Sequence, residues 1–245
     1  MHWNKGDAMT TKPAYFVTGT DTEIGKTLIA GTLLYALSQQ GLHAAGMKPV
    51  AAGAELRDGV WHNEDVDFLA ASATASLPTA LTTPYLFEEP TAPHIAAANE
   101  GISIEPARIL DCYAQVHAAA DAVVVEGVGG FRVPLTADYD TADLAKDLGL
   151  PVILVVGLRL GCLNHTLLTA EAIAARGLTL AGWVANVVDL GMDYGMANVD
   201  ALTQRLLAPM LGCVPRLPAP LPSAAASHLD FSSLPGWPTS RPQRP

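Results

Sequence analysis

Three residues near the N-terminus, Gly25, Lys26 and Thr27, have the types and the order needed to bind a phosphate group. An apolar stretch precedes their loop at residues 15–17, and an apolar pattern with helical spacing follows at residues 28–37. A loop between a strand and a helix points backbone N–H groups and the positive end of the helix at one small volume. Lys26 adds a mobile positive charge, and the hydroxyl of Thr27 can coordinate Mg²⁺. The sequence therefore predicts a loop that binds the phosphates of a nucleotide.

This loop is one residue longer than the common pattern G-x-x-x-x-G-K-[ST]. Gly19 stands one position early, and Thr20 occupies the place of the usual glycine. A Gly-Lys-Thr without a strand before it is mostly a coincidence of a loop or a helix start. The prediction therefore depends on the strand and the helix around the loop.

Other polar residues follow further apolar runs. Lys48, Glu126, Asn186 and residues 159–164 each come directly after a stretch that we expect to be a strand. In an open parallel sheet, ligands bind outside the carboxyl ends of the strands, so these residues should meet at one site. Each has an ordinary interpretation as well. Glu126 could be a helix cap rather than a Mg²⁺ ligand, and Lys48 an exposed lysine rather than a phosphate contact.

On residue type alone, three other positions are not expected to bind a ligand or to take part in catalysis. Asp65 lies in a charged helix start with Glu64 and Asp67, so on sequence alone it is a solvated partner of the helix dipole. His94 and His165 are, by the same standard, an ordinary turn histidine and an ordinary helix-start histidine.

Strand and helix patterns alternate along the chain, which favours an α/β fold with a P-loop NTPase-like, doubly wound, mostly parallel sheet and helices on both faces. The helices are expected at residues 28–37, 64–71, 105–119, 141–148, 162–175 and 197–207, and residues 51–62 and 73–90 are expected to be irregular. We predict a flexible N-terminal extension at residues 1–13, a single domain at residues 14–220 and a Pro-rich, disordered tail at residues 221–245. Met9 could be the natural start.

Composition narrows the class of protein. The chain has 245 residues, 50% of them hydrophobic, and 14 Lys+Arg against 24 Asp+Glu give a net charge of −10. An acidic protein without a basic face is a poor nucleic-acid binder. The 3 cysteines are far apart and form no C-x-x-C pair, which suits a reducing cytosol. Neither a signal peptide nor an apolar run long enough to cross a bilayer is evident, so we expect a cytoplasmic protein without a membrane partner.

Six segments together resemble dethiobiotin synthetase, in the same order and with similar spacing from Tyr15 to about Pro215. The resemblance includes the lengthened phosphate loop. The segments are residues 15–27, 47–53 (MKPVAAG), 84–101 (which contains PTAPH), 125–130 (VEGVGG), 151–168 and 181–186 (AGWVAN).

The resemblance implies an ATP-dependent ligase of biotin biosynthesis, with Mg²⁺ as cofactor. Its substrates would be 7,8-diaminononanoate, CO₂ or bicarbonate, and ATP. The N7 amine is carboxylated to a carbamate, whose oxygen attacks the γ-phosphate to give a carbamic–phosphoric anhydride. The second amine then displaces phosphate and closes the ureido ring of dethiobiotin. The protein would act by positioning and by stabilising charge.

The resemblance also implies a role for each matching residue. Lys26 and Lys48 would be catalytic, Lys48 by stabilising the carbamate and the transferring phosphoryl group. The metal ligands would be Thr27, Asp65 and Glu126. The nucleotide-binding residues would be Thr22, Glu23, Ile24, Gly25, Lys26, Thr27, Leu28, Asp65, Glu126, Gly127, Val128, Gly129, Asn186, Val187, Pro215, Arg216 and Leu217. The substrate-binding positions would be Ala52, Gly161, Cys162, Leu163 and Asn164.

At Ala52 the family often has a hydroxyl residue that contacts the substrate, and beyond Leu217 no resemblance continues. Family resemblance implies a homodimer with shared active sites, in which residues 161–164 bind the substrate carboxylate of the neighbouring chain. The rival class is a ParA/MinD-type ATPase switch, but its loop carries an early lysine where this chain has Asp21. A cobyrinic-acid amidating synthetase shares the long loop but needs a glutaminase domain, for which 245 residues leave no room.

Overall fold

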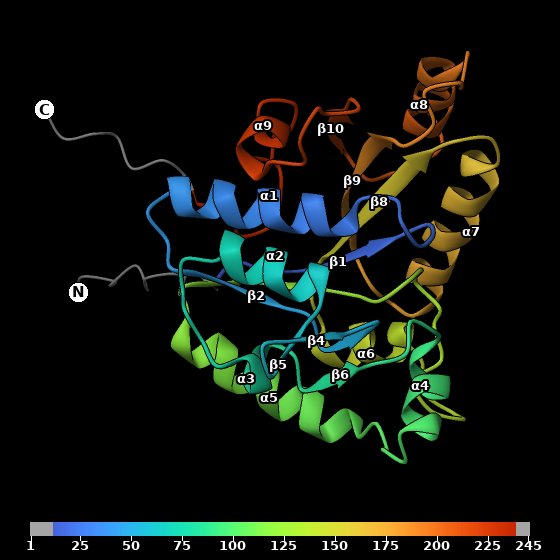
Figure 1. Ribbon diagram of the computed structural model, residues 1–245. Helices are drawn as coiled ribbons and strands as arrows, with labels where there is room; N and C mark the ends of the chain where they lie inside the picture. The colour runs from blue at the N-terminus through green and yellow to red at the C-terminus, as the bar shows by residue number, and fades with distance from the viewer. Residues whose placement is uncertain (1–11, 239–245) are drawn as a thin grey trace, which may run out of the picture.

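The computed structural model describes residues 12–238, which form a six-stranded parallel sheet between layers of helices (Figure 1). The strand order is β10-β9-β8-β1-β7-β2. The strands of this sheet are β1 (Ala14–Gly19), β2 (Ala44–Met47), β7 (Ala122–Glu126), β8 (Val152–Leu158), β9 (Leu180–Val187) and β10 (Met210–Val214). From β1 the chain winds outward to β2 on one side and later to β10 on the other, so the predicted doubly wound sheet is confirmed.

Helices cover both faces of this sheet because its strands are apolar on both sides. Tyr15 and Val17 of β1 pack toward α1, α2 and α9, whereas Phe16 packs toward α5 and α6. Figure 1 shows α1, α2 and α9 on one side of the strands and α5 on the other. The helices are α1 (Lys26–Gln39), α2 (Glu64–Ser72), α3 (Thr79–Thr82), α4 (Pro93–Asn99), α5 (Pro106–Ala119), α6 (Thr141–Leu148), α7 (Cys162–Ala175), α8 (Gly195–Thr203) and α9 (Pro222–Ala226).

Local signals fix the ends of two helices. Asp140 caps α6 in a reciprocal capping box with Asp143, and Gly149 ends the helix at a φ of 65°. Asn63 caps α2 by accepting hydrogen bonds from the backbone N–H groups of Asp65 and Val66. The cap of α2 therefore places Asp65 in the first helical turn.

Two expected irregular segments contain short elements. Residues 51–62 hold part of β3 (Val50–Ala52) and the hairpin of β4 (Glu55–Arg57) with β5 (Val60–His62), and β6 (Tyr85–Phe87) pairs with β3 in parallel. Strands of three residues are too short for an alternating pattern to stand out from a loop, so the prediction was wrong there. The pairing of β3 with β6 fixes residues 50–52, which follow β2 and Lys48 in the chain.

The prediction of disorder at residues 221–245 is wrong for residues 221–238. This segment packs on α1, where Phe231 and Leu234 are buried, and the hydroxyl of Tyr15 donates a 2.9 Å hydrogen bond to the carbonyl of Pro235. Widely spaced apolar side chains among the prolines supply enough burial to order the segment. Residues 239–245 lie outside the described residues.

The expected flexible extension needs a similar correction at its end. Lys12 donates hydrogen bonds to the carbonyls of His117 and Ala120, and the carbonyl of Pro13 accepts one from Val123. Residues 12 and 13 are therefore fixed to the sheet and α5, and residues 1–11 lie outside the described residues. Within residues 12–238 we find no helix with the length and apolar character needed to cross a membrane.

Candidate nucleotide and metal site

The phosphate loop joins β1 to α1 at the middle of the sheet. Gly25 has a φ of 89°, and a side chain there would place its Cβ 2.3 Å from Nδ2 of Asn186. That Nδ2 atom donates a 2.8 Å hydrogen bond to the carbonyl of Ile24, and Ile24 is itself fully buried. Asn186, near the end of β9, thus fixes the phosphate loop through the carbonyl of Ile24. Its side chain lies so close to Gly25 that only glycine fits at position 25.

Lys26 opens α1 and is almost completely buried. Its Nζ donates a 2.7 Å hydrogen bond to the carbonyl of Asp21. Burial, and then the charge of Lys48, lower the pKa of Lys26 to about 8. No side chain caps the start of α1, so its first N–H groups and this ammonium can receive an anion together.

Four side chains, three from α1, α2 and β7 and one from the loop after β2, meet beside the phosphate loop. The Nζ atom of Lys48 donates hydrogen bonds of 2.6 Å to Oδ2 of Asp65 and 2.7 Å to Oε1 of Glu126. The hydroxyl of Thr27 lies 2.6 Å from Oδ1 of Asp65 and 2.9 Å from the same Oε1 of Glu126. Lys48 and Glu126 are 3% and 0% exposed and therefore hidden from water, whereas Asp65 is 42% exposed.

Burial and charge shift the pKa values in this cluster. Burial raises the pKa of Glu126 even though Lys48 opposes the shift. Burial also works against the carboxylate of Asp65, but the charge and hydrogen bond of Lys48 lower the pKa of that group. Burial disfavours the ammonium of Lys48 as well, yet its two carboxylate partners outweigh burial and raise its pKa. The cluster therefore keeps one ammonium between two acidic groups.

The oxygen atoms of this cluster fit a divalent cation. Thr27 has one hydroxyl proton but faces two carboxylates, and Oε2 of Glu126 is buried without a hydrogen-bond partner. A Mg²⁺ ion takes one or two carboxylates and fills its other positions with water and phosphate oxygens. Within the described part of the chain, no group of three or more His, Cys, Asp or Glu side chains could hold a metal. Two carboxylates and a hydroxyl therefore suit a cation bound together with nucleotide.

A cavity of about 620 Å³ lies in front of these groups. It contains many of the predicted site residues, namely Thr22, Glu23, Gly25, Lys26, Thr27, Lys48, Ala52, Asp65, Val128 and Gly129. Its other wall consists of residues that we did not name as site residues, namely Ala51, Pro90, Thr91, Ala92, Pro93, Gly130 and Val133. The segment PTAPH was the available signal for residues 91–93, because it is part of the family resemblance. Its prolines gave no reason to expect a cavity wall.

Other predicted residues support the site from outside the cavity. Gly127 accepts a 3.3 Å hydrogen bond from Nζ of Lys48 through its carbonyl oxygen. Leu28 packs on the α1 side of the core, and Val187 ends β9 directly after Asn186. An ion pair between Arg159 and Asp21, which sequence reasoning missed, ties the loop after β8 to the phosphate loop.

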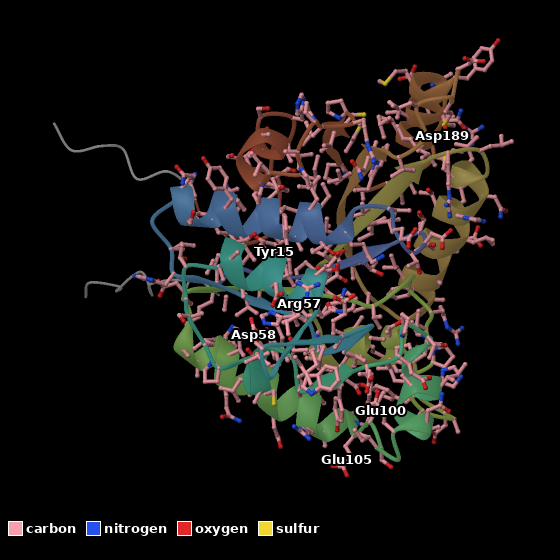
Figure 2. All side chains as sticks on the ribbon, in the orientation of Figure 1. Tyr15, Arg57, Asp58, Glu100, Glu105 and Asp189 are labelled. Carbon is pink, nitrogen blue, oxygen red and sulfur yellow. The ribbon has the colours of Figure 1, made fainter. Side chains whose placement is uncertain are left out.

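Two predicted groups lie away from this cavity. Gly161, Cys162, Leu163 and Asn164 form the start of α7, where Cys162 is buried and Asn164 is exposed. Pro215 and Arg216 are exposed after β10, and Leu217 packs on the α1 side of the core. Figure 2 labels Asp189, which follows β9, near α8 at the edge of the molecule. In the described chain, neither group lines the nucleotide cavity.

Comparison with known proteins shows similarity along most of the chain. Residues 13–222 match the family described as AAA domain. The ATP-dependent dethiobiotin synthetase BioD of Janthinobacterium sp. (strain Marseille) is 64% identical over 227 residues, which cover 91% of this chain and 96% of that protein. Identity at this level over nearly both whole chains shows the family.

Solved structures with lower identity share the fold. The septum site-determining protein MinD complexed with Mg-ADP from Pyrococcus horikoshii OT3 has a TM-score of 0.53 and 16% identity, covering 92% of this chain and 88% of that one. A ParA family ATPase from Chlorobium tepidum TLS has a TM-score of 0.52 and 16% identity, covering 88% and 91%. These likenesses concern the fold alone and agree with the predicted P-loop architecture.

Proposed function

We propose, from the premise that the chain belongs to the family of ATP-dependent dethiobiotin synthetases, that it converts a diamine, CO₂ and ATP into dethiobiotin, ADP and phosphate. The diamine would be 7,8-diaminononanoate, carboxylated at one amine to a carbamate. The observation that supports this best is the buried Lys48 between Asp65 and Glu126, directly beside the phosphate loop. Such a group suits a reaction in which negative charge develops between a carbamate and the γ-phosphate.

The two lysines would divide the work. Lys26, at the start of α1, would bind the outer phosphates in ground and transition states alike. The ammonium of Lys48 would meet the carbamate oxygen and the transferring phosphoryl group, where charge builds up only during reaction. Neither lysine has to act as a nucleophile, because positioning and charge stabilisation are sufficient for phosphoryl transfer.

Thr27, Asp65 and Glu126 would hold Mg²⁺ together with the nucleotide. When bound, Mg²⁺ would neutralise charge on the phosphates. The chain's own contribution is to keep Oε2 of Glu126 without a partner and to hold Lys48 beside it. Gly127, Val128 and Gly129 would let the backbone approach the phosphates and the diamine, and Ala52 would line the diamine's part of the cavity. Asn186, Val187 and residues 215–217 would lie toward the adenine.

The working unit would be a homodimer in which α7 of one chain completes the site of the other. Large apolar side chains are exposed around the start of α7 and α8, with Leu160 at 94%, Leu190 at 77% and Tyr194 at 76%. Leu190 and Tyr194 also line a hollow of about 350 Å³ beside Leu158. Exposed apolar groups gathered in this way favour a protein interface. The N–H groups at residues 161–164 would then receive the substrate carboxylate of the neighbouring chain.

Complementation tests the shared site. Chains with Lys48→Gln and chains with Leu163→Pro would be mixed after each is shown to fold and to exchange subunits. A shared site gives some mixed dimers one intact site and therefore recovers activity. If the mixed chains exchange subunits but regain no activity, or if a stable monomer is fully active, the shared site is excluded.

Product analysis tests the reaction itself. The protein would be incubated with diaminononanoate, ¹³C-bicarbonate and MgATP, and the product analysed by mass for labelled dethiobiotin. Labelled product should require ATP, the diamine and bicarbonate together, and Lys48→Gln should abolish most of it. ATP turnover that ignores the diamine and bicarbonate would instead favour the ParA/MinD-type switch. For such a synthetase we propose a cytoplasmic location, which suits the three free cysteines.

A further inference from the structure

A second, smaller cavity reaches Lys48 from the opposite direction. Its volume is about 100 Å³, and it lies at the outer edge of β2, the last strand of the sheet. Figure 1 shows α2 and α3 on either side of this edge strand. The cavity is lined by Gly46, Lys48, Val66, Leu69, Ala70, Ala73, Ala75, Ser76, Leu77, Thr79, Thr82 and Thr83. Among the described residues, Lys48 alone lines both this cavity and the nucleotide cavity.

The small cavity has an outer and an inner end. Ala70, Ser76 and Thr79 are exposed and form its mouth, whereas Leu69 is 2% exposed and Lys48 3%. The backbone N–H of Lys48 donates a 2.8 Å hydrogen bond to the carbonyl of Thr82, which fixes the inner end to α3. Lys48 therefore stands between this cavity, which opens at the surface, and the nucleotide cavity.

The chemistry of the lining selects a small neutral molecule. Aliphatic side chains and hydroxyl groups line the cavity, and Lys48 is its one charged residue. The ammonium of Lys48 already donates to Asp65, Glu126 and the carbonyl of Gly127, so an anion would find no free cation here. About 100 Å³ is also too small for a nucleotide or a long diamine, whose sites usually measure about 300–1,000 Å³.

We infer that this cavity admits CO₂ and delivers it past Lys48 to the amine of the bound diamine. The inference rests on the proposed function, because CO₂ has to reach that amine. There the nitrogen lone pair forms an N–C bond, one C=O electron pair moves onto oxygen, and the amine loses a proton to water. The product is the carbamate. A separate entrance lets CO₂ arrive while nucleotide and diamine fill the larger cavity.

Blocking the mouth tests the route. Ala70→Leu and the larger Ala70→Phe place a side chain over the opening, and Ala71→Leu adds the same bulk one position along α2, at an exposed residue outside the cavity. Rates would be measured with saturating MgATP and diamine at varied CO₂, with carbonic anhydrase present. Ala70→Leu should raise KM for CO₂ about tenfold, with kcat restored at high CO₂ and KM for ATP unchanged. Ala71→Leu should behave like the native protein.

Several outcomes would overturn the inference. An unchanged KM for CO₂ in both Ala70 variants, or an equal rise in Ala71→Leu, would show that the opening is not the route. Without carbonic anhydrase, CO₂ and bicarbonate interconvert slowly and can be tested as separate substrates. A native reaction that starts at once from bicarbonate but after a lag from CO₂ would show that bicarbonate is the substrate, and would also refute the inference. A native protein that makes no dethiobiotin would instead refute the proposed function. Crystals under CO₂ pressure should hold the gas beside Leu69 and Leu77.

Discussion

Removing the positive charge of Lys48 should destabilise the protein, because Glu126 would lose its counter-charge while remaining buried. Glu126 is 0% exposed and lies 2.7 Å from Nζ of Lys48, whereas Asp65 is 42% exposed and can turn to water. Breaking a buried ion pair from one side costs about 3–5 kcal/mol. We therefore expect Lys48→Met to lower the free energy of unfolding by about that amount in buffer with a metal chelator.

The matched double variant isolates the cause. In Lys48→Met/Glu126→Gln no uncompensated charge remains at the buried position, so the loss should fall below about 2 kcal/mol. The pH dependence gives a second check. Burial already raises the pKa of Glu126, and a carboxyl group with a raised folded pKa favours folding while it is protonated. The deficit of Lys48→Met should therefore shrink as the pH falls toward the ordinary glutamate pKa of about 4.3.

The assay is urea unfolding followed by circular dichroism at several pH values, with native protein and the Glu126→Gln single variant as controls. A loss below about 1 kcal/mol for Lys48→Met would refute the reasoning, since it would mean that Glu126 reaches water or another partner. Additive losses in the double variant would refute it too, because they would show no coupling between the two side chains.

Three further predictions concern the cofactor site, a helix cap and the C-terminal segment. Glu126→Gln should reduce turnover about 10²–10³-fold and weaken the dependence of the rate on Mg²⁺. Lys26→Gln should reduce turnover and weaken ATP binding as well. Steady-state kinetics and ATP titration check both variants, and a Glu126→Gln enzyme with native turnover would contradict the assignment. Asp140→Asn should keep the cap, since Asn caps a helix as well as Asp does. It should still cost about 1 kcal/mol at pH 7, because hydrogen bonds from the backbone N–H of Asp143 and from Arg132 outweigh burial and lower the pKa of the Asp140 carboxyl group. That stability is present above about pH 3.9 and is lost as the pH falls through the lowered folded pKa, so urea unfolding should give the two proteins equal stability in strong acid. Phe231→Ala should cost about 3–5 kcal/mol if the C-terminal segment is part of the core, and thermal or urea unfolding with no change would show that it is not.

The sheet could be predicted because its strands carry continuous apolar runs. Val123, Val124 and Val125 are all completely buried, and only a strand covered on both faces accommodates three such neighbours. The helix expected at residues 141–148 has the same bounds as α6, which Gly149 ends. These features depend on residues that are close together in the sequence, so the sequence pattern alone indicates them.

The candidate metal site could be only partly predicted, because it depends on residues that are distant in the sequence. Glu64, Asp65 and Asp67 look alike in sequence, and it is the cap of Asn63 and the placement of α2 that bring Asp65 to Thr27 and Lys48. The family resemblance supplied Asp65, whereas residue types alone favoured a solvated carboxylate. The ordered structure of residues 221–238 was not predicted, because the many prolines of this segment suggested disorder. Its packing depends instead on a few apolar side chains, Phe231 and Leu234 among them.

The hydrogen bond from Asn186 to Ile24 joins residues 162 positions apart, so the phosphate loop can be completed only late in the synthesis of the chain. The phosphate loop leaves the ribosome early, but the side chain that holds it emerges only with β9. At about 5–20 residues per second, the nascent loop waits roughly 8–30 seconds for this partner. β1 must also wait for β7 and β8, its two neighbours in the sheet. ATP therefore has no finished site to bind during most of translation, and it can stabilise only a chain whose synthesis has passed β9.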